Sequence, residues 1–329
     1  MKLLFIFTGG TIGSTANGEY ISVDAKKPYL LLKSYAEKHT LPDYDTAQPY
    51  TALSENLTGT ELSALIACVR ENLSKYDGII ITHGTDTLQY TAAALAYAFG
   101  NSTPPIVLVS SNHPLEHPNA NAIPNLFGAV SFIMAQGGSG VFVSYKNPAD
   151  TKISIHRGAR LLASEPFSDA FYSLKHQAYG YIDPTDGTFE RNPEYHESAD
   201  KTEPFSVGEL SPCAEQILRI SPCTGLAYPP ISAKIRYILH ETYHSGTLNT
   251  VSPSAISFFE EAKRRGIPIF ATGISHGISY ESTRYFDTFG IRPLGEIAPI
   301  AAYMKLWLAS ESGCDVQTVM GLSLGGDMG

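Results

Sequence analysis

Cysteine is scarce in this sequence, with four residues in a chain of 329, and no two of them form a CxxC pair. A zinc ribbon or a dithiol redox motif needs closely spaced cysteine pairs, so neither is indicated. The pattern is typical of reduced thiols in a cytosolic protein, and a single disulfide is also compatible with it. The four positions are Cys68, Cys213, Cys223 and Cys314.

Clusters of positive charge and long apolar runs are missing as well. The net charge is −9 and no run of Lys or Arg stands out, which argues against a nucleic-acid partner, because such binding depends on clustered cations. No apolar run is long enough to span a bilayer, which argues against a membrane partner. Only five apolar residues lie between Lys2 and Thr8, fewer than a secretory signal contains. We therefore expect a cytoplasmic protein.

The sequence does contain enough apolar residues for a large core, at 43% hydrophobic and 17% charged. Apolar runs typical of buried strands alternate with segments of helical spacing, which predicts an α/β fold with a parallel sheet covered on both faces. Strands are expected at 3–7, 78–82, 104–111, 140–145, 234–239 and 266–272, and helices at 60–73, 86–99, 125–136, 252–265 and 296–310.

The composition changes at 183–212, which is rich in Pro, Gly, Ser and charge and shows little apolar periodicity. Such a stretch is typical of a linker. We therefore predict a larger N-terminal α/β domain at 1–182, a linker at 183–212 and a smaller C-terminal α/β domain at 213–329.

Two turns follow predicted strands and carry unusual residues. They are "FTGGTIGST" after 3–7 and "THGTDT" after 78–82. Parallel α/β sheets place functional groups at the carboxyl ends of their strands, and Gly9 and Gly10 allow the backbone to bend tightly there. Thr85 and Asp86 could instead be ordinary caps of the following helix. We expect His83 to be a packed, hydrogen-bonded residue.

Three other motifs are weaker. "TGGTIG" is an imperfect dinucleotide-binding fingerprint, because Thr8 replaces its first glycine, and no GxxxxGK[ST] loop exists. A nucleotide-binding enzyme is therefore the weakest alternative. "GISHG" at 273–277 matches the GxSxG nucleophile motif, but no histidine follows His276, so the order Ser…Asp…His cannot be completed and Ser275 is discounted.

"TGGTIG" (8–13) and "THGTDT" (82–87), in this order, resemble the two signatures of the bacterial-type L-asparaginase/glutaminase family. The resemblance extends to "LSEN" (53–56), to "NLFGAV" (125–130) and to a second α/β domain, and it is closest to the cytoplasmic type I branch. It implies a larger N-terminal parallel-sheet domain, a smaller C-terminal α/β domain and a catalytic site at the two turns.

The resemblance also implies the catalytic residues. Thr11 matches the nucleophile, and Tyr20, on the loop that follows, matches the tyrosine that assists it. Thr85 matches the threonine that positions water or helps proton transfer. Asp86 matches the carboxylate that pairs with the α-ammonium group of the substrate.

Substrate-binding residues follow from the same comparison. Ser54 matches the serine that holds the α-carboxylate, and Glu55 stands where it could face the ammonium group. Gly10 and Gly84 belong to turns whose backbone N–H groups can stabilise a developing oxyanion. The chemistry is consistent, because a neutral threonine hydroxyl needs a partner to take its proton and a zwitterion needs both a carboxylate and hydrogen-bond donors.

The resemblance implies no cofactor and no metal, a small amino-acid amide as substrate, and a homodimer or homotetramer. The C-terminal helix around Trp307 is a candidate for the apolar contact surface of such an oligomer.

One family residue is missing, a lysine that supports the second threonine. Its position falls on Leu162 or Ala163, and the nearest lysine is Lys152. Arg160 cannot act as a base, because its pKa is far too high. Two hypotheses therefore remain. One is an amidohydrolase that acts on asparagine or a close relative through Thr11. The other is an asparaginase-like amino-acid-binding protein, or a subunit of a larger enzyme, with little or no turnover.

Overall fold

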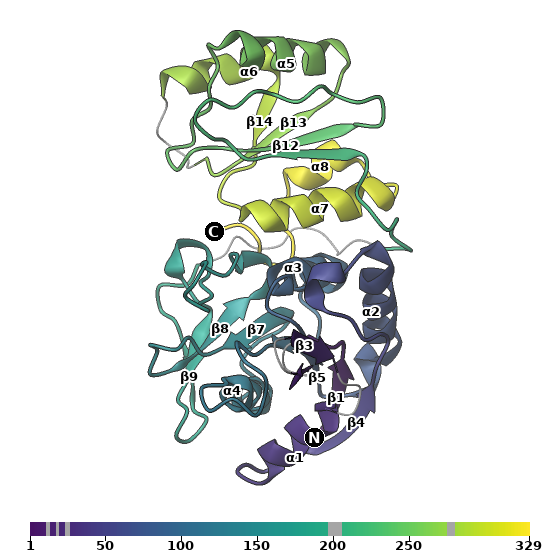
Figure 1. The fold of residues 1–329 in the computed structure, drawn as a ribbon, viewed down its shortest axis with the longest axis vertical. Coiled ribbons are helices and arrows are strands. Elements are labelled where there is room, and N and C mark those ends of the chain that lie inside the picture. Colours follow the sequence, from purple (N-terminus) through teal and green to yellow (C-terminus); the bar gives the residue numbers. More distant parts are fainter. Residues whose placement is uncertain (11–13, 18–19, 24–26, 197–205, 275–279) are drawn as a thin grey trace.

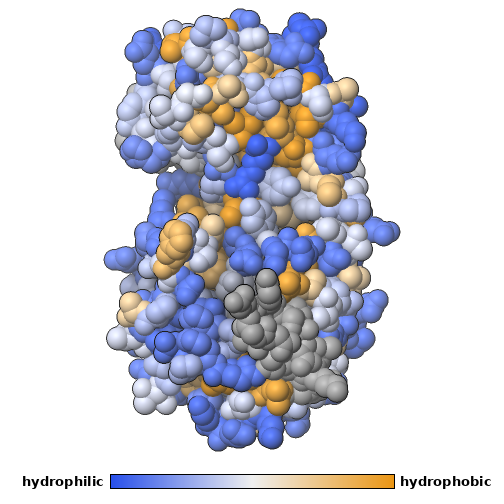
Figure 2. Space-filling view, in the orientation of Figure 1, coloured by the Kyte–Doolittle hydropathy of each residue, from blue (hydrophilic) through white to orange (hydrophobic). Residues whose placement is uncertain are grey.

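The computed structural model describes residues 1–10, 14–17, 20–23, 27–196, 206–274 and 280–329, and the side chains of 11–29 lie outside this description. Two lobes are stacked along the long axis, and helices α7 and α8 lie between them (Figure 1). We call the lobe with the N-terminus the larger lobe and the other the smaller lobe. Figure 2 shows a notch between the lobes at the left of the view and hydrophobic residues gathered on part of the smaller lobe.

The larger lobe is built on an eight-stranded sheet with the order β10-β9-β8-β7-β6-β5-β1-β4. The strands from β4 to β7 in this order are parallel, and β8, β9 and β10 are antiparallel additions. Their bounds are β1 Lys2–Phe7, β4 Asp43–Ala47, β5 Gly78–Thr82, β6 Ile106–Val109, β7 Val141–Tyr145, β8 Ile153–Arg157, β9 Gly180–Ile182 and β10 Phe189–Arg191. The short strands β2 (Ser14–Asn17) and β3 (Tyr20–Val23) form a separate antiparallel pair.

The sheet is therefore mixed, where the sequence predicts a parallel one. Only 146–152 connects β7 to β8, and a parallel return would need a crossover of a dozen or more residues. The chain has to turn back antiparallel at this point.

Apolar side chains cover both faces of this sheet. One face packs against α2 (Gly59–Asn72) and α3 (Leu88–Phe99), and α7 (Pro299–Glu311) packs in turn on α3. The other packs against α1 (Lys27–Ala36) and α4 (Ala122–Met134). The central strands β5, β6 and β7 are buried along their whole length, which explains why their sequences are nearly continuous apolar runs.

The smaller lobe holds a parallel four-stranded sheet, as the sequence predicts for a second α/β unit. Its strands are β11 Ile217–Ile220, β12 Tyr237–Glu241, β13 Ile269–Thr272 and β14 Ile291–Pro293, and its helices are α5 Pro253–Arg264 and α6 Phe286–Phe289. A core of its own lies between this sheet and these helices.

The two lobes share an apolar core. Leu239 and Phe270 of the smaller sheet belong to the same buried cluster as α3 and α7. Trp307 on α7 is only 7% exposed, because it packs inside this cluster, so it contributes little to an outer contact surface. This is a correction to the expectation for that helix.

Part of the predicted linker is ordered and packed. Within 183–212, strand β10 pairs with β9, and further along Leu210 is buried and its N–H donates to the Ser63 hydroxyl at 2.8 Å. The division into two domains at this segment stays a prediction.

The last described residues return to the junction between the lobes. Asp327 lies 2.9 Å from the ammonium group of Lys305 on α7, and both side chains are fully buried. The hydroxyl of Tyr97 on α3 donates to the same carboxylate at 3.0 Å, and Arg160 donates to the Gly326 carbonyl at 2.9 Å. Helix α8 (Val316–Met320) precedes this segment.

All four cysteines are free thiols in the structure. Across the part of the chain that the structure describes, no helix combines the length and the apolarity needed to cross a bilayer.

Candidate active site

The two turns singled out in the sequence lie side by side. Strands β1 and β5 are neighbouring and parallel, with Phe7 opposite Thr82, so the segments after them leave the same edge of the sheet. The Thr8 hydroxyl donates to the Thr82 carbonyl at 2.6 Å and ties the two strand ends together. The described residues of the two turns are therefore adjacent.

Gly10 and Gly84 allow the two backbones to touch. A Cβ atom on Gly10 would lie 2.3 Å from the Gly84 nitrogen, and one on Gly84 would lie 2.4 Å from the Ser54 hydroxyl. Gly10 also has a φ of 77°, which favours glycine. Its N–H donates to the Ala52 carbonyl at 3.1 Å, so this group is already used within the chain rather than free to bind an oxyanion.

Ser54 and Asp86 form the polar centre of the site. The buried Ser54 hydroxyl donates to the Asp86 carboxylate at 3.2 Å, whereas Asp86 itself is exposed. The Thr87 hydroxyl donates to the Ser54 carbonyl at 2.9 Å and holds the two segments in register. Glu55 follows Ser54 and is exposed. An exposed carboxylate beside a buried hydroxyl can meet a cationic group that arrives from solvent.

Thr85 and Asp86 are not helix caps. Helix α3 begins at Leu88, two residues later than predicted, and its N-cap residue is Thr87, which makes no side-chain capping bond. The capping interpretation is therefore wrong. The half-buried Thr85 lies at this edge of the sheet and is available to the candidate site.

His83 is a packed residue, as the sequence predicts. It is fully buried, its Nδ1 donates to the Gly84 carbonyl at 2.8 Å, and its Nε2 accepts from the Thr91 hydroxyl at 2.8 Å. Burial lowers the pKa of this imidazole to about 4, so it is neutral at physiological pH. Through these two bonds His83 holds the turn to α3.

The family model "Asparaginase, N-terminal" matches residues 2–195. The chain belongs to the asparaginase family. An L-asparaginase from Thermococcus kodakarensis is 27% identical over 94% of this chain and 92% of that protein. A glutamyl-tRNA(Gln) amidotransferase subunit from Aeropyrum pernix is 28% identical over 94% of this chain and 75% of that protein.

Solved structures show the same fold. The thermostable L-asparaginase of Thermococcus kodakarensis superposes with a TM-score of 0.79 at 24% identity, covering 100% of this chain and 99% of that one. The L-asparaginase I of Vibrio cholerae superposes with a TM-score of 0.77 at 20% identity, with the same coverage. The resemblance inferred from "TGGTIG" and "THGTDT" is therefore confirmed.

Thr11, the predicted nucleophile, lies outside the described part of the chain. Ser275 and His276 of the discounted "GISHG" turn lie outside it as well. Tyr20 is the first residue of β3, and its side chain is not described. The roles of Thr11 and Tyr20 stay predictions.

Leu162 and Ala163, where the resemblance places the family lysine, lie on a hairpin, 161–173, whose two ends pair at Leu161 and Ser173. The Leu162 N–H donates to the Tyr172 carbonyl at 2.9 Å, and its half-buried side chain packs on the core, whereas Ala163 is exposed. Lys152 forms an ion pair with Glu190 on β10. Among the described residues, Asp86 has no ion-pair partner.

The sequence did not predict the roles of Thr87 and Ala52 in the site. Both act through bonds that fix the positions of Ser54 and Gly10. Thr87 belongs to the "THGTDT" signature, so a signal was present, but Ala52 acts through its carbonyl and gives none. Over the residues that the structure describes, no group of three His, Cys, Asp or Glu side chains is placed to hold a metal ion.

Proposed function

We propose that this asparaginase-family protein is an amidohydrolase that converts L-asparagine, or a related amino-acid amide, to L-aspartate and ammonia. The observation that supports this most is the meeting of Gly10, Gly84, Ser54 and Asp86 at the adjacent ends of β1 and β5. The position is the one at which open α/β sheets bind their ligands.

The proposed binding mode uses Asp86 and Ser54. The exposed Asp86 carboxylate pairs with the α-ammonium group of the substrate. Without substrate, the Ser54 hydroxyl donates to the Asp86 carboxylate and orients it. When substrate binds, the hydroxyl turns and donates to the substrate α-carboxylate instead. Thr87 holds the Ser54 backbone in place through its bond to the carbonyl.

The proposed chemistry proceeds by double displacement. The Thr11 hydroxyl, which loses its proton with the help of Tyr20, attacks the side-chain amide carbon, and the C–N bond breaks as the nitrogen leaves as ammonia. Water positioned by Thr85 then hydrolyses the acyl-threonine ester and restores the hydroxyl. These roles rest on the family resemblance and on the position of the second turn.

The test is ammonia release from L-asparagine, L-glutamine and a small panel of other amino-acid amides. Thr11→Ala should fold normally and lose turnover, and Thr11→Ser should keep part of it because the hydroxyl survives. Thr60→Ala, at an exposed position on α2, is the matched control and should behave like the parent. Equal turnover by Thr11→Ala and the parent would rule out Thr11 as nucleophile.

The second candidate is an amino-acid-binding protein, or a subunit of a larger enzyme, with little turnover. It is favoured by the absence of a lysine at Leu162 and Ala163, and by relatives such as the amidotransferase subunit from Aeropyrum pernix. Calorimetry separates the two candidates, because this one predicts binding of L-asparagine or L-aspartate without ammonia release.

Two further proposals concern the whole protein. We infer a cytoplasmic location and a homodimer or homotetramer from the resemblance to type I asparaginases. A mass in solution near the 35.6 kDa of one chain would contradict the assembly.

A further inference from the structure

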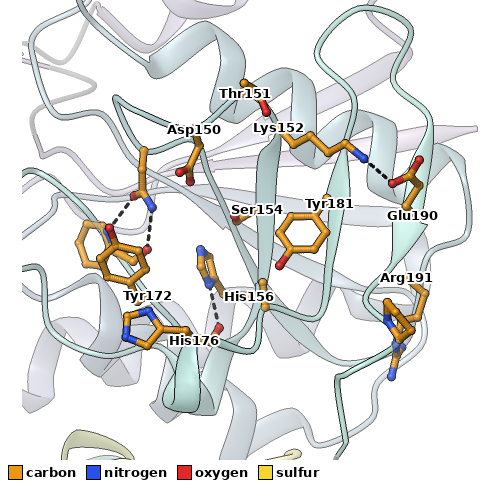
Figure 3. Close-up of a pocket in the computed structure, with 15 residues that line it drawn as sticks. Asp150, Thr151, Lys152, Ser154, His156, Tyr172, His176, Tyr181, Glu190 and Arg191 are labelled. Carbon is orange, nitrogen blue, oxygen red and sulfur yellow. Dashed lines mark hydrogen bonds and ion pairs between the residues drawn. The ribbon is translucent and has the colours of Figure 1, made fainter.

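A pocket lies on the larger lobe, apart from the proposed catalytic edge. It has a volume of about 520 Å³ and lies on β8 and β9, with hairpin 161–173 at its side (Figure 3). This volume suits a small organic molecule. Strands β6 and β7 separate β8 from β5, so the pocket lies roughly 14 Å along the sheet from the proposed site, at about 4.8 Å per strand.

His156 supplies an unpaired polar atom at this pocket. The side chain is only 2% exposed, its Nδ1 lies 2.8 Å from the Ser173 hydroxyl, and its Nε2 is buried without a partner in the described structure. In Figure 3 this free nitrogen points toward the space between Asp150 and Ser154. A buried polar group left unpaired destabilises the folded state, so a molecule in the pocket that bonds to it removes this cost.

The imidazole of His156 is neutral, because burial lowers its pKa to about 4. When Nδ1 carries the proton and donates to Ser173, the free Nε2 is a hydrogen-bond acceptor. The other groups that converge on the same space also accept hydrogen bonds. They are the Asp150 carboxylate and the hydroxyl oxygens of Ser154 and Tyr181 (Figure 3).

The lysine and the arginine that line the pocket are engaged elsewhere. Lys146, which is not a lining residue, donates through its ammonium group to the Asp150 backbone carbonyl at 2.7 Å. Lys152 forms an ion pair with Glu190 at the rim. The Arg191 guanidinium lies 3.5 Å from the ring centroid of Tyr179, and in Figure 3 it points away from the centre. An anionic ligand would therefore face the Asp150 carboxylate, and neither the lysine nor the arginine among the described lining residues turns toward it. The pocket does not favour an anion. A metal ion is not favoured either, since no three suitable ligands gather within the described residues.

We propose that this pocket binds a small molecule that carries a primary ammonium group, held between Asp150 and His156. An ammonium group has three donors and no acceptor, which matches an interior that offers a carboxylate, an imidazole nitrogen and two hydroxyl oxygens. The rings of Tyr172 and Tyr181 line the pocket and provide apolar surface and cation–π attraction for the rest of the ligand. This site is separate from the proposed catalytic edge and does not depend on asparagine hydrolysis.

The test uses three probes of one shape: benzylammonium, benzyl alcohol and benzoate. Binding to the full chain is measured at pH 7.5 by titration monitored with NMR, using protein labelled with ¹⁵N in its histidines so that the His156 ring nitrogens are observed. We expect benzylammonium to bind about tenfold more tightly than benzyl alcohol and to shift the His156 Nε2 signal, and benzoate to bind most weakly.

Asp150→Asn should weaken benzylammonium binding by about tenfold, because the charge-assisted bond is lost while the shape is kept. Asp287→Asn removes an exposed carboxylate from the smaller lobe and should leave binding unchanged. The proposal is overturned if benzylammonium fails to bind at millimolar concentration, if the three probes bind equally, or if Asp150→Asn binds like the parent.

Discussion

At the scale of single residues, Gly84 lies very close to its neighbours at the catalytic edge, so its replacement should be costly. In Gly84→Ala the new methyl group would lie 2.4 Å from the Ser54 hydroxyl and force the two segments apart. We expect a loss of about 1–3 kcal/mol in the free energy of unfolding and a large fall in amide hydrolysis. Urea unfolding and ammonia release measure the two effects.

Gly208→Ala is the matched control, because its added methyl group meets nothing within 4 Å. It should change neither stability nor turnover. If Gly84→Ala behaves like Gly208→Ala, Gly84 does not lie against the Ser54 side chain as described.

Asp86 should contribute mainly to substrate binding. Asp86→Asn removes the charge that pairs with the α-ammonium group and keeps the Ser54 hydroxyl bond possible. We expect the KM for L-asparagine to rise by at least about tenfold, as the loss of a charged hydrogen bond implies. Steady-state kinetics measure this, with Asp287→Asn as control, and an unchanged KM would remove Asp86 from the binding site.

At the scale of elements, hairpin 161–173 offers a way to restore the missing lysine. Ala163 is exposed and can take a longer side chain, so Ala163→Lys should raise turnover, by up to about 100-fold if the amine reaches Thr85 and Asp86. Leu162 packs on the core, so Leu162→Lys should cost stability instead. Single-turnover ammonia release and thermal unfolding of the two variants make the comparison.

If Ala163→Lys releases ammonia at the same rate as the parent, another group already fills the role of the lysine. Lys152→Gln is then a further control and should not change the rate of ammonia release. Its ion pair with Glu190 holds the Lys152 amine at the pocket on β8 and β9.

The sequence predicts some elements well because their signal is local. Strand β5 is buried at every residue, so its apolar run gave correct bounds. Helix α3 starts late, because Thr85, Asp86 and Thr87 form the turn that reaches Ser54, a contact between segments about 30 residues apart.

Other elements give little signal. Strand β4 (DYDTA) is polar because it lies at the edge of the sheet, and β8 (ISIHR) buries a histidine and an arginine, which are residue types typical of the surface. For the candidate site, the motifs identified Gly10, Ser54, Gly84 and Asp86. The carbonyl of Ala52 and the unpaired nitrogen of His156 depend on tertiary packing and could not be predicted.

At the scale of the whole molecule, two buried neutral histidines predict a loss of stability in acid. Burial lowers the pKa values of His83 and His156 from 6.5 to about 4. Between these pH values the unfolded chain binds more protons than the folded one, so the free energy of unfolding falls as the pH drops below about 6.5. The expected loss is about 2 kcal/mol for each histidine at pH 5 relative to pH 7.5.

Urea unfolding at several pH values measures this dependence. His156→Gln should flatten the slope between pH 6.5 and pH 4, whatever it does to stability itself, whereas His176→Gln, at an exposed position, should leave the slope as it is. A free energy of unfolding that is constant from pH 7.5 to pH 5 would contradict the neutral, buried state of the two imidazoles.

The packing of α3 against α7 has a consequence for synthesis of the protein. Helix α3 is buried along almost its whole length, partly by α7, which follows about 200 residues later in the chain. At about 5–20 residues per second, α7 leaves the ribosome roughly 10–40 s after α3. During this interval the alanine-rich surface of α3 is open to water and to other nascent chains. Chaperones that hold apolar segments should therefore bind this protein in the period between the appearance of the two helices, and release it once α7 docks.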